Sequence, residues 1–270
     1  MPNDWGASMA NNGQGTRRRL ADYLEYLADI GVETLPKAKG TRIKADTTSA
    51  GTRRENTAAE SFLEAVTILP ADASPGLLTV KDSDLAGIRA DMGECRRCKL
   101  AKNRIQIVFG SGSPQAKVMF IGEGPGADED QQGVPFVGKA GQLLTKIIEA
   151  IRFTREEVYI ANVVKCRPPG NRTPEGDEIA ACRDFLFRQI AVIKPWIICA
   201  LGAPSAQTLL GVKTPIGQIR GKWFPCRGTW LIPTFHPSYL LRNPSAKKEV
   251  WEDVKSLRAR YDALCREAGR

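Results

Sequence analysis

Four cysteines in the chain have the spacing of a metal centre. Cys95 and Cys98 form a Cys-x-x-Cys pair, Cys166 follows after 67 further residues, and Cys182 follows after 15 more. The turn in a Cys-x-x-Cys pair brings both sulfurs to one side, so both can bind one centre. Four thiolates suit structural zinc or a [4Fe–4S] cluster, and the long gap favours a cluster that joins distant segments. The alternative is that Cys166 or Cys182 is an ordinary buried thiol.

The chain has one histidine, His236, so any chemistry that needs an imidazole must use it. His236 opens the segment HPSYLLRNP, in which Pro237 restricts the backbone of His236 and helps to fix its side chain. Leu240, Leu241 and Arg242 follow. Leucines exposed at a loop tip would suit a wedge pushed into a base stack, whereas leucines that begin a helix would face the core.

A third segment with chemical potential is the glycine-rich run GEGPGADEDQQGVPFVGKAGQLL at residues 122–144. It lacks the Lys-Ser/Thr pair of a P-loop, which argues against a nucleoside triphosphate site. Its glycines would let the backbone approach a flat ligand closely. Glu123 lies where the preceding strand should end, and Phe136, between proline and valine, could stack on a base. The alternative for Phe136 is core packing.

Alternating strands and helices position these segments. Strands are predicted at 117–123, 158–164, 196–202 and 229–235, and helices at 138–151, 173–193, 203–211 and 245–268. This order predicts a three-layer α/β/α fold with a central, mainly parallel sheet of about four strands. Because sites in such folds form at the carboxyl ends of the strands, we expect the loops GEGPG, NVVKCRPPG and HPSYLLRNP to meet.

The charge of the chain is unevenly distributed. Residues 1–85 carry 10 Lys and Arg against 12 Asp and Glu, whereas residues 86–270 carry 29 against 18. A basic folded region indicates a polyanionic partner such as nucleic acid, and solubility is the alternative explanation. No apolar run of about 18 residues and no secretory signal pattern occurs, so we expect a cytoplasmic protein.

The N-terminal third differs in character from the rest. We expect residues 1–85 to be an extension with a short amphipathic helix at about 18–31 and a flexible linker, followed by one domain at 86–270. The helix could dock on this domain or on a protein partner.

Together the motifs resemble one known family. GEGPGADED with GVPFVGKAG, NVVKCRP, the four-cysteine spacing and HPSYLLRNP look like the family 4 uracil-DNA glycosylases, the iron–sulfur branch of their superfamily. The resemblance covers roughly residues 86–262. It implies a monofunctional hydrolase of base excision repair that breaks the N-glycosidic bond of deoxyuridine in DNA, leaving uracil and an abasic site. The base must leave the duplex stack to be reached.

The resemblance also implies roles for residues. His236 would donate a hydrogen bond to uracil O2 as negative charge develops, and Phe136 would stack on the base. Asn162 would bind O4 and N3–H, because an amide offers both a donor and an acceptor. Glu123 would orient water or stabilise the sugar cation. The implied uracil-binding set is Gly122, Glu123, Gly124, Phe136, Asn162 and His236, of which Glu123 and His236 are catalytic.

The remaining implications concern the metal, the DNA and the relatives. Cys95, Cys98, Cys166 and Cys182 would hold a structural [4Fe–4S] cluster, and Leu240, Leu241 and Arg242 would form the DNA wedge. The best-known branch has an aspartate at the position of Gly124, so the water-positioning group differs here. A related branch that links covalently to DNA has an inserted basic loop with a histidine, which NVVKCRPPGNRTPE lacks.

We therefore expect a monomeric, nucleoid-associated bacterial enzyme. The alternatives are a non-enzymatic nucleic-acid-binding or redox iron–sulfur protein, and a glycosylase for another deaminated base such as hypoxanthine.

Overall fold

The computed structural model describes residues 84–269. The predicted helix at about residues 18–31 and the linker after it lie outside this part of the chain. They and the domain boundary at residue 86 stay predictions. None of the helices between residues 84 and 269 combines the length and the apolar character that a membrane-spanning segment needs.

The core of the domain is a six-stranded sheet in the order β1-β3-β2-β4-β6-β5. The four central strands are parallel and confirm the four predicted strands. The two edge strands are antiparallel to their neighbours and were not expected, because each has too few residues to show an alternating pattern. The bounds are β1 Ser111–Gly112, β2 Val118–Gly122, β3 Tyr159–Asn162, β4 Ile197–Leu201, β5 Phe224–Cys226 and β6 Thr229–Thr234.

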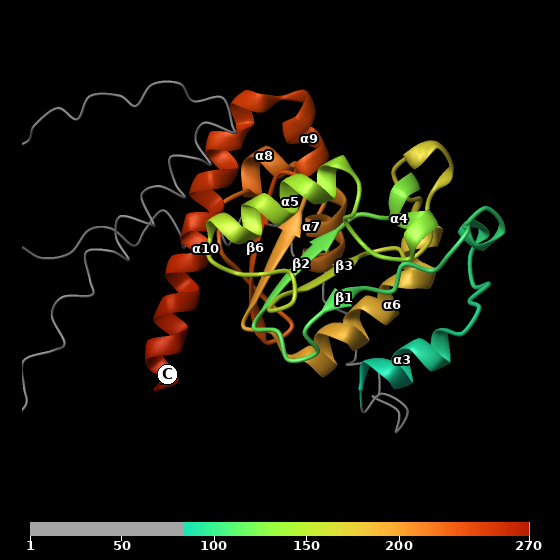
Figure 1. Ribbon diagram of the computed structural model, residues 1–270, viewed down its shortest axis with the longest axis horizontal. Coiled ribbons are helices and arrows are strands. Elements are labelled where there is room, and N and C mark those ends of the chain that lie inside the picture. Colours follow the sequence, from blue (N-terminus) through green and yellow to red (C-terminus); the bar gives the residue numbers. More distant parts are fainter. Residues whose placement is uncertain (1–83, 270) are drawn as a thin grey trace, which may run out of the picture. The chain divides into compact units, whose positions relative to one another are not determined.

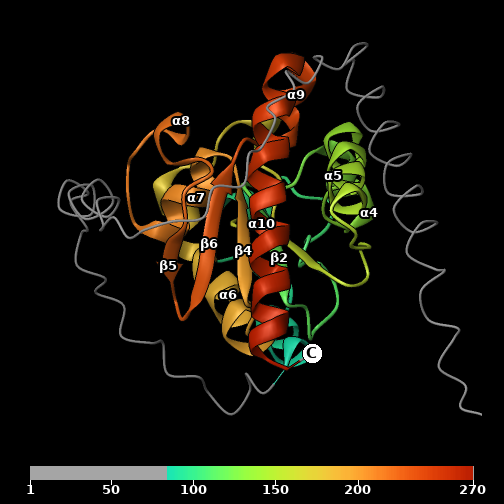
Figure 2. The ribbon, with the colours of Figure 1, turned by 90° about the vertical axis from the view of Figure 1, so that its left-hand side faces the viewer.

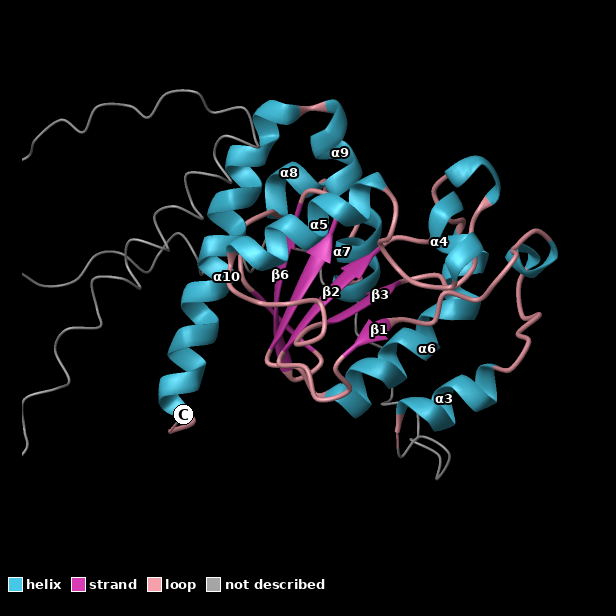
Figure 3. Ribbon diagram, in the orientation of Figure 1, coloured by secondary structure: helices cyan, strands magenta, loops and turns pink. Residues whose placement is uncertain are grey.

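Helices connect the strands and cover the sheet (Figure 3). The α-helices are α3 Leu85–Met92, α4 Ala127–Gln132, α5 Lys139–Ala150, α6 Gly176–Ile193, α7 Ala203–Leu210, α8 Ile216–Ile219, α9 Pro237–Arg242 and α10 Lys247–Glu267. Three short 3₁₀ helices are η2 Lys99–Lys102, η3 Pro169–Asn171 and η4 Pro244–Ala246.

Successive side chains of the buried strands point to opposite faces of the sheet, and each face has its own hydrophobic core. In β2, Val118 and Phe120 face a core with α5, α9 and α10, whereas Met119 and Ile121 face a core with α3, α6, α7 and α8. Both faces of the sheet are therefore covered, with α5 and α10 on one side and α6 and α7 on the other (Figure 2). This arrangement confirms the three-layer α/β/α prediction.

Helix α6 and the glycine-rich segment differ from the prediction. Helix α6 begins at Gly176 rather than at residue 173, because Glu175 is its N-cap and Glu178 Oε2 accepts a hydrogen bond from Glu175 N at 2.8 Å. The glycine-rich segment also contains a helix, α4, where a loop was expected. Because α6 begins only at Gly176, residues 173–175 belong to a loop beyond the sheet and not to a helix.

Candidate active site

The predicted loops meet at the carboxyl ends of the parallel strands. A cavity of about 740 Å³ lies there, and Glu123, Gly124, Phe136, Asn162 and His236 all line it. Helix α9, which His236 precedes, lies beyond the same end of the sheet (Figure 1). The structure thus brings five of the six predicted uracil-binding residues to one cavity, with Gly122 immediately before Glu123.

Asn162 ends strand β3 and has an unsatisfied side chain. It is 1% exposed, and neither its Nδ2 nor its Oδ1 has a hydrogen-bond partner within the described residues. An unpaired buried amide costs about 1–3 kcal/mol, so the chain keeps it at the expense of stability. Gly122 pairs with Asn162 in the sheet, and a Cβ at Gly122 would overlap both Asn162 Oδ1 and Phe136 Cζ. Glycine at 122 therefore leaves room for both side chains.

Phe136 is held in an unusual backbone conformation. Its φ is 54°, which is costly for a residue with a bulky side chain. Arg155 Nη2 donates to the carbonyl of Pro135 at 2.8 Å and fixes the chain just before it. The ring is 6% exposed and lies 5.6 Å from the His236 ring, centroid to centroid. Phe136 thus packs in the core and also lines the cavity, so its two predicted positions are compatible.

Glu129 joins the two parts of the glycine-rich segment. Its Oε2 accepts from Gly126 N at 3.0 Å, and its Oε1 accepts from Val137 N at 2.9 Å and Gly138 N at 3.0 Å. The buried Asp130 accepts from Ile105 N at 2.9 Å. Both carboxylates therefore have backbone partners, and those of Glu129 join segments that line the cavity.

His236 is the N-cap of α9, and its protonation state follows from its contacts. Nδ1 accepts a hydrogen bond from Ser238 N at 3.1 Å and lies 2.7 Å from Ser238 Oγ. Because a backbone N–H can only donate, Nδ1 must present its lone pair, and the neutral ring carries its proton on Nε2. Burial, assisted by the charge of Arg242, lowers the pKa of His236 to about 4.

The single histidine makes this assignment directly testable. We expect ¹⁵N NMR to show one imidazole, protonated on Nε2 and not titrating between pH 5 and pH 8. The unfolded chain binds a proton near pH 6.5 and the folded chain only near pH 4, so stability is lost as pH falls through this window. The free energy of unfolding should fall by up to about 3 kcal/mol over it. A His236→Gln variant should lack this component, and an unchanged pH dependence would contradict the assignment.

Four helices begin at the cavity. Their N-caps are Gly126, Gly138, Gly202 and His236, and all four line it. The N-terminal end of a helix carries partial positive charge, which favours negative charge nearby. The cavity therefore suits a ligand or leaving group that is anionic or becomes so.

Glu123 lines the cavity directly after β2. Burial raises the pKa of its carboxyl group, and a hydrogen bond from the Thr173 side chain opposes this shift. At the next position a Cβ on Gly124 would lie 2.8 Å from Val164 Cγ2, so a larger residue needs a local shift. This packing agrees with glycine at the position where another branch has aspartate.

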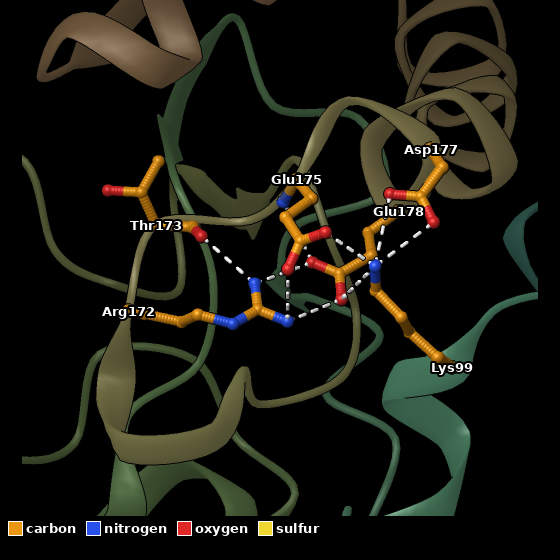
Figure 4. Close-up of polar contacts among 6 residues, drawn as sticks. All are labelled: Lys99, Arg172, Thr173, Glu175, Asp177 and Glu178. Carbon is orange, nitrogen blue, oxygen red and sulfur yellow. Dashed lines mark hydrogen bonds and ion pairs between the residues drawn. The ribbon is translucent and has the colours of Figure 1, made fainter.

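A network of charges anchors the loop that carries Thr173 (Figure 4). Arg172 donates to the Thr173 carbonyl at 3.0 Å and makes a two-point contact with Glu178, at 2.9 and 2.7 Å. The Glu178 side chain is fully buried, and Lys99 pairs with Glu175 at 2.5 Å from the other side. The network ties the cavity wall to η2, immediately after Cys98. The sequence did not indicate this network, although the spacing of Glu175 and Glu178 is that of a capping box.

One of the three residues of the predicted DNA wedge, Leu240, is buried. Leu240 is 1% exposed and packs in the core, because α9 turns that side chain toward the sheet. The prediction that Leu240 lies at an exposed loop tip is wrong. Leu241 is 47% exposed, and the exposed Arg242 lines the cavity together with Tyr239.

The four predicted metal-binding cysteines line one small cavity between α3, η2, the loop after β3 and α6. Cys166 and Cys182 are buried, and Cys95 and Cys98 are partly exposed. Within residues 84–269, no group of three or more His, Cys, Asp or Glu side chains has the arrangement for holding a single metal ion. Cys199 is a separate buried thiol, packed in β4.

Nitrogen donors surround these sulfurs. Arg97 Nη1 lies 3.5 Å from Cys95 Sγ, and Arg104 Nη1 lies 3.6 Å from Cys166 Sγ. The backbone N of Lys165 donates to Cys182 Sγ at 3.3 Å. Burial raises the pKa of Cys166 to about 11 and also raises the pKa of Cys182, and the nearby donors and positive charges oppose this shift toward the thiolate that binds metal. The residues present therefore fit a group held by thiolates.

Comparison with known proteins agrees with this geometry. Residues 109–255 match the model of the Uracil DNA glycosylase superfamily. The type-4 uracil-DNA glycosylase of Thermotoga maritima is 47% identical over 172 residues, which are 62% of this chain and 88% of the relative. That of Saccharolobus solfataricus is 45% identical over 184 residues, 63% of this chain and 83% of the relative. The chain belongs to the type-4 uracil-DNA glycosylases.

The family resemblance seen in the sequence is thus confirmed. A type-5 uracil-DNA glycosylase of Pyrobaculum aerophilum is also similar, but only 27% identical over 173 residues, which are 57% of this chain and 75% of the relative. The superfamily match contains the cavity residues and Cys166 and Cys182, but it begins after Cys95 and Cys98. Half of the cysteine set therefore lies outside the part common to the superfamily.

Proposed function

We propose that this chain excises uracil from DNA by hydrolysing the N-glycosidic bond of deoxyuridine, leaving free uracil and an abasic site. The observation that carries this proposal is the buried, unpartnered amide of Asn162 beside Phe136 and His236. Uracil offers an acceptor at O4 and a donor at N3–H, which would satisfy both groups of the amide. Cytosine presents the opposite pattern, so its edge would not match the same amide orientation.

The reaction leaves negative charge on the base and positive charge on the sugar. In the proposed mechanism His236 donates its Nε2–H to uracil O2 as charge develops there, and the four helix N-termini favour the same charge. A neutral imidazole can act in this way over a wide pH range, because its pKa is about 4. Phe136 stacks on a base that has been turned out of the duplex.

Glu123 is the proposed group that orients water or stabilises the sugar cation. A Thr173→Val variant removes the hydrogen bond that opposes the effect of burial, so the pKa of Glu123 should rise further. We expect uracil release to fall about two- to tenfold at neutral pH and the acidic limb of its pH profile to move to higher pH. Thr154→Val, at an exposed position outside the cavity, is the matched control. An unmoved acidic limb would show that Thr173 does not act through Glu123.

Cys95, Cys98, Cys166 and Cys182 are the proposed ligands of a [4Fe–4S] cluster. In such a cluster each thiolate binds a different iron, so the sulfurs need not converge on one ion as they do around zinc. The cluster would supply a structural link between the segment at residues 95–98, the loop after Asn162 and helix α6. Iron and sulfide analysis of anaerobically purified full chain tests the assignment.

The exposed Leu241 and Arg242 are the proposed contact with the DNA stack next to the extruded base. Leu241 lies at the surface on α9, and Arg242 lies at the rim of the cavity. An apolar side chain can fill the gap that a flipped base leaves, while an arginine contacts phosphate.

The proposed substrate is tested with a panel of oligonucleotides. Each carries one uracil, hypoxanthine, thymine or cytosine, and hot alkali cleaves the strand wherever a base has been removed. We expect cleavage only of the uracil strand. Cleavage of the hypoxanthine strand alone would establish a different deaminated base, and DNA binding without any cleavage would indicate a non-enzymatic protein.

A further inference from the structure

Lys165 is a buried cation without a buried anion to match it. Its side chain is 1% exposed, and its Nζ donates to the Asn162 carbonyl at 2.9 Å and to Gln189 Oε1 at 2.7 Å. Both acceptors are neutral, and no carboxylate in the described part of the chain pairs with Lys165. Burying an ammonium with only neutral partners is strongly unfavourable, so a negative group is expected nearby.

The place of Lys165 indicates what that negative group is. Lys165 lines the small cavity together with all four predicted cysteine ligands, and its own backbone N donates to Cys182 Sγ. A [4Fe–4S] cluster with four thiolates carries net negative charge. Arg104 also approaches a sulfur, but it pairs with the exposed Glu94 at 3.5 Å, so it already has an anionic partner.

We propose that Lys165 is the internal counter-ion of the cluster and also positions the segment that presents Asn162 to uracil. The inference rests on the proposed cluster. Lys165 lines the sulfur cavity and interacts electrostatically with Cys182, and its ammonium group donates to the backbone carbonyl of Asn162, three residues earlier, so this residue is a physical link between the two sites. Lys165 is a positioning residue and touches neither uracil nor the sugar.

If Lys165 is a counter-ion, its charge should have opposite effects on the cluster-bound and the cluster-free protein. With the cluster bound, the ammonium offsets its negative charge and slows its loss. Without the cluster, the ammonium is an uncompensated buried charge that weakens the fold. Reduction adds an electron to the cluster, so a nearby positive charge also raises the reduction potential.

Lys165→Met in the full chain tests the inference, because methionine keeps an unbranched side chain and removes the charge. We expect Lys165→Met to lose iron to a chelator about 10- to 100-fold faster than wild type and to have a lower reduction potential. The cluster-free variant should melt at a higher temperature than cluster-free wild type. Lys102→Met, at an exposed position in η2, is the control and should change none of these. Lys165→Arg, which retains a charge, should keep iron better than Lys165→Met.

Two results would overturn the inference. If Lys165→Met loses iron at the wild-type rate and keeps the wild-type potential, Lys165 is only a hydrogen-bonding support for Asn162. If wild-type protein purified anaerobically contains no iron or sulfide, the proposed cluster itself is wrong. The first result leaves the proposed cluster and uracil excision intact, so the two failures are distinguishable.

Discussion

Replacing His236 with alanine should lower uracil release about 10²–10³-fold under single-turnover conditions. The variant loses the Nε2–H donor that meets the charge developing on uracil O2, and no other histidine exists to replace it. Iron content should stay close to wild type because His236 does not line the cysteine cavity, and affinity for uracil-containing DNA should stay close to wild type because the proposed wedge residue Leu241 is unchanged. Rapid-quench measurement of base release, with parallel binding and iron assays, checks all three.

The control for this prediction lies at the other end of α9. Asn243 is the C-cap of α9 and lies outside the cavity, so Asn243→Ala should release uracil at nearly the wild-type rate. The loss in His236→Ala should be similar at pH 6 and pH 8, since the imidazole is neutral at both. A loss of less than about tenfold would mean that the helix N-termini carry most of the anion stabilisation instead.

Replacing Asn162 with leucine should make the protein more stable and far less active. Leucine has a similar branched shape but no polar atoms, so it removes the unpaired amide from the core. The free energy of unfolding should rise by about 1 kcal/mol, as measured by denaturant titration. Uracil release should fall about 10²-fold or more, because the base loses its matched donor and acceptor and leaves its own polar edge unpaired.

Opposite changes in stability and activity separate this role from a packing role. Asn103→Leu, at an exposed position after η2, should leave uracil release unchanged and supplies the control for a surface asparagine. If Asn162→Leu destabilises the protein as well as inactivating it, then the amide has a structural partner and is not left open for hydrogen bonds to a ligand.

Patterns within single segments predicted much of this molecule. The four central strands were visible as short apolar runs, and the three loops at their carboxyl ends met as the rules for parallel sheets require. The family resemblance implied that Glu123, Phe136, Asn162 and His236 share one site, and all four line one cavity. The four cysteines also proved to line one cavity, as their spacing suggested.

Features that depend on long-range packing could not be predicted. Whether Leu240 is exposed or buried depends on which face of α9 meets the sheet, and the residues around it are apolar on both sides. Lys165 reads as an ordinary basic residue until α6 brings Gln189 to its ammonium group. Thr173 likewise looked like the start of a helix. Its contact with Glu123 joins two loops that are 50 residues apart in the sequence, so no local pattern could reveal it.

The most direct test of the central claim is chemical analysis of one reaction. Cluster-loaded full chain is incubated with a single-stranded oligonucleotide that contains one deoxyuridine, in water enriched in ¹⁸O, and both products are examined by mass spectrometry. We predict one free uracil for each abasic strand, with ¹⁸O on the sugar and none on the base. Intact strands, or uracil release without ¹⁸O in the sugar, would contradict the account.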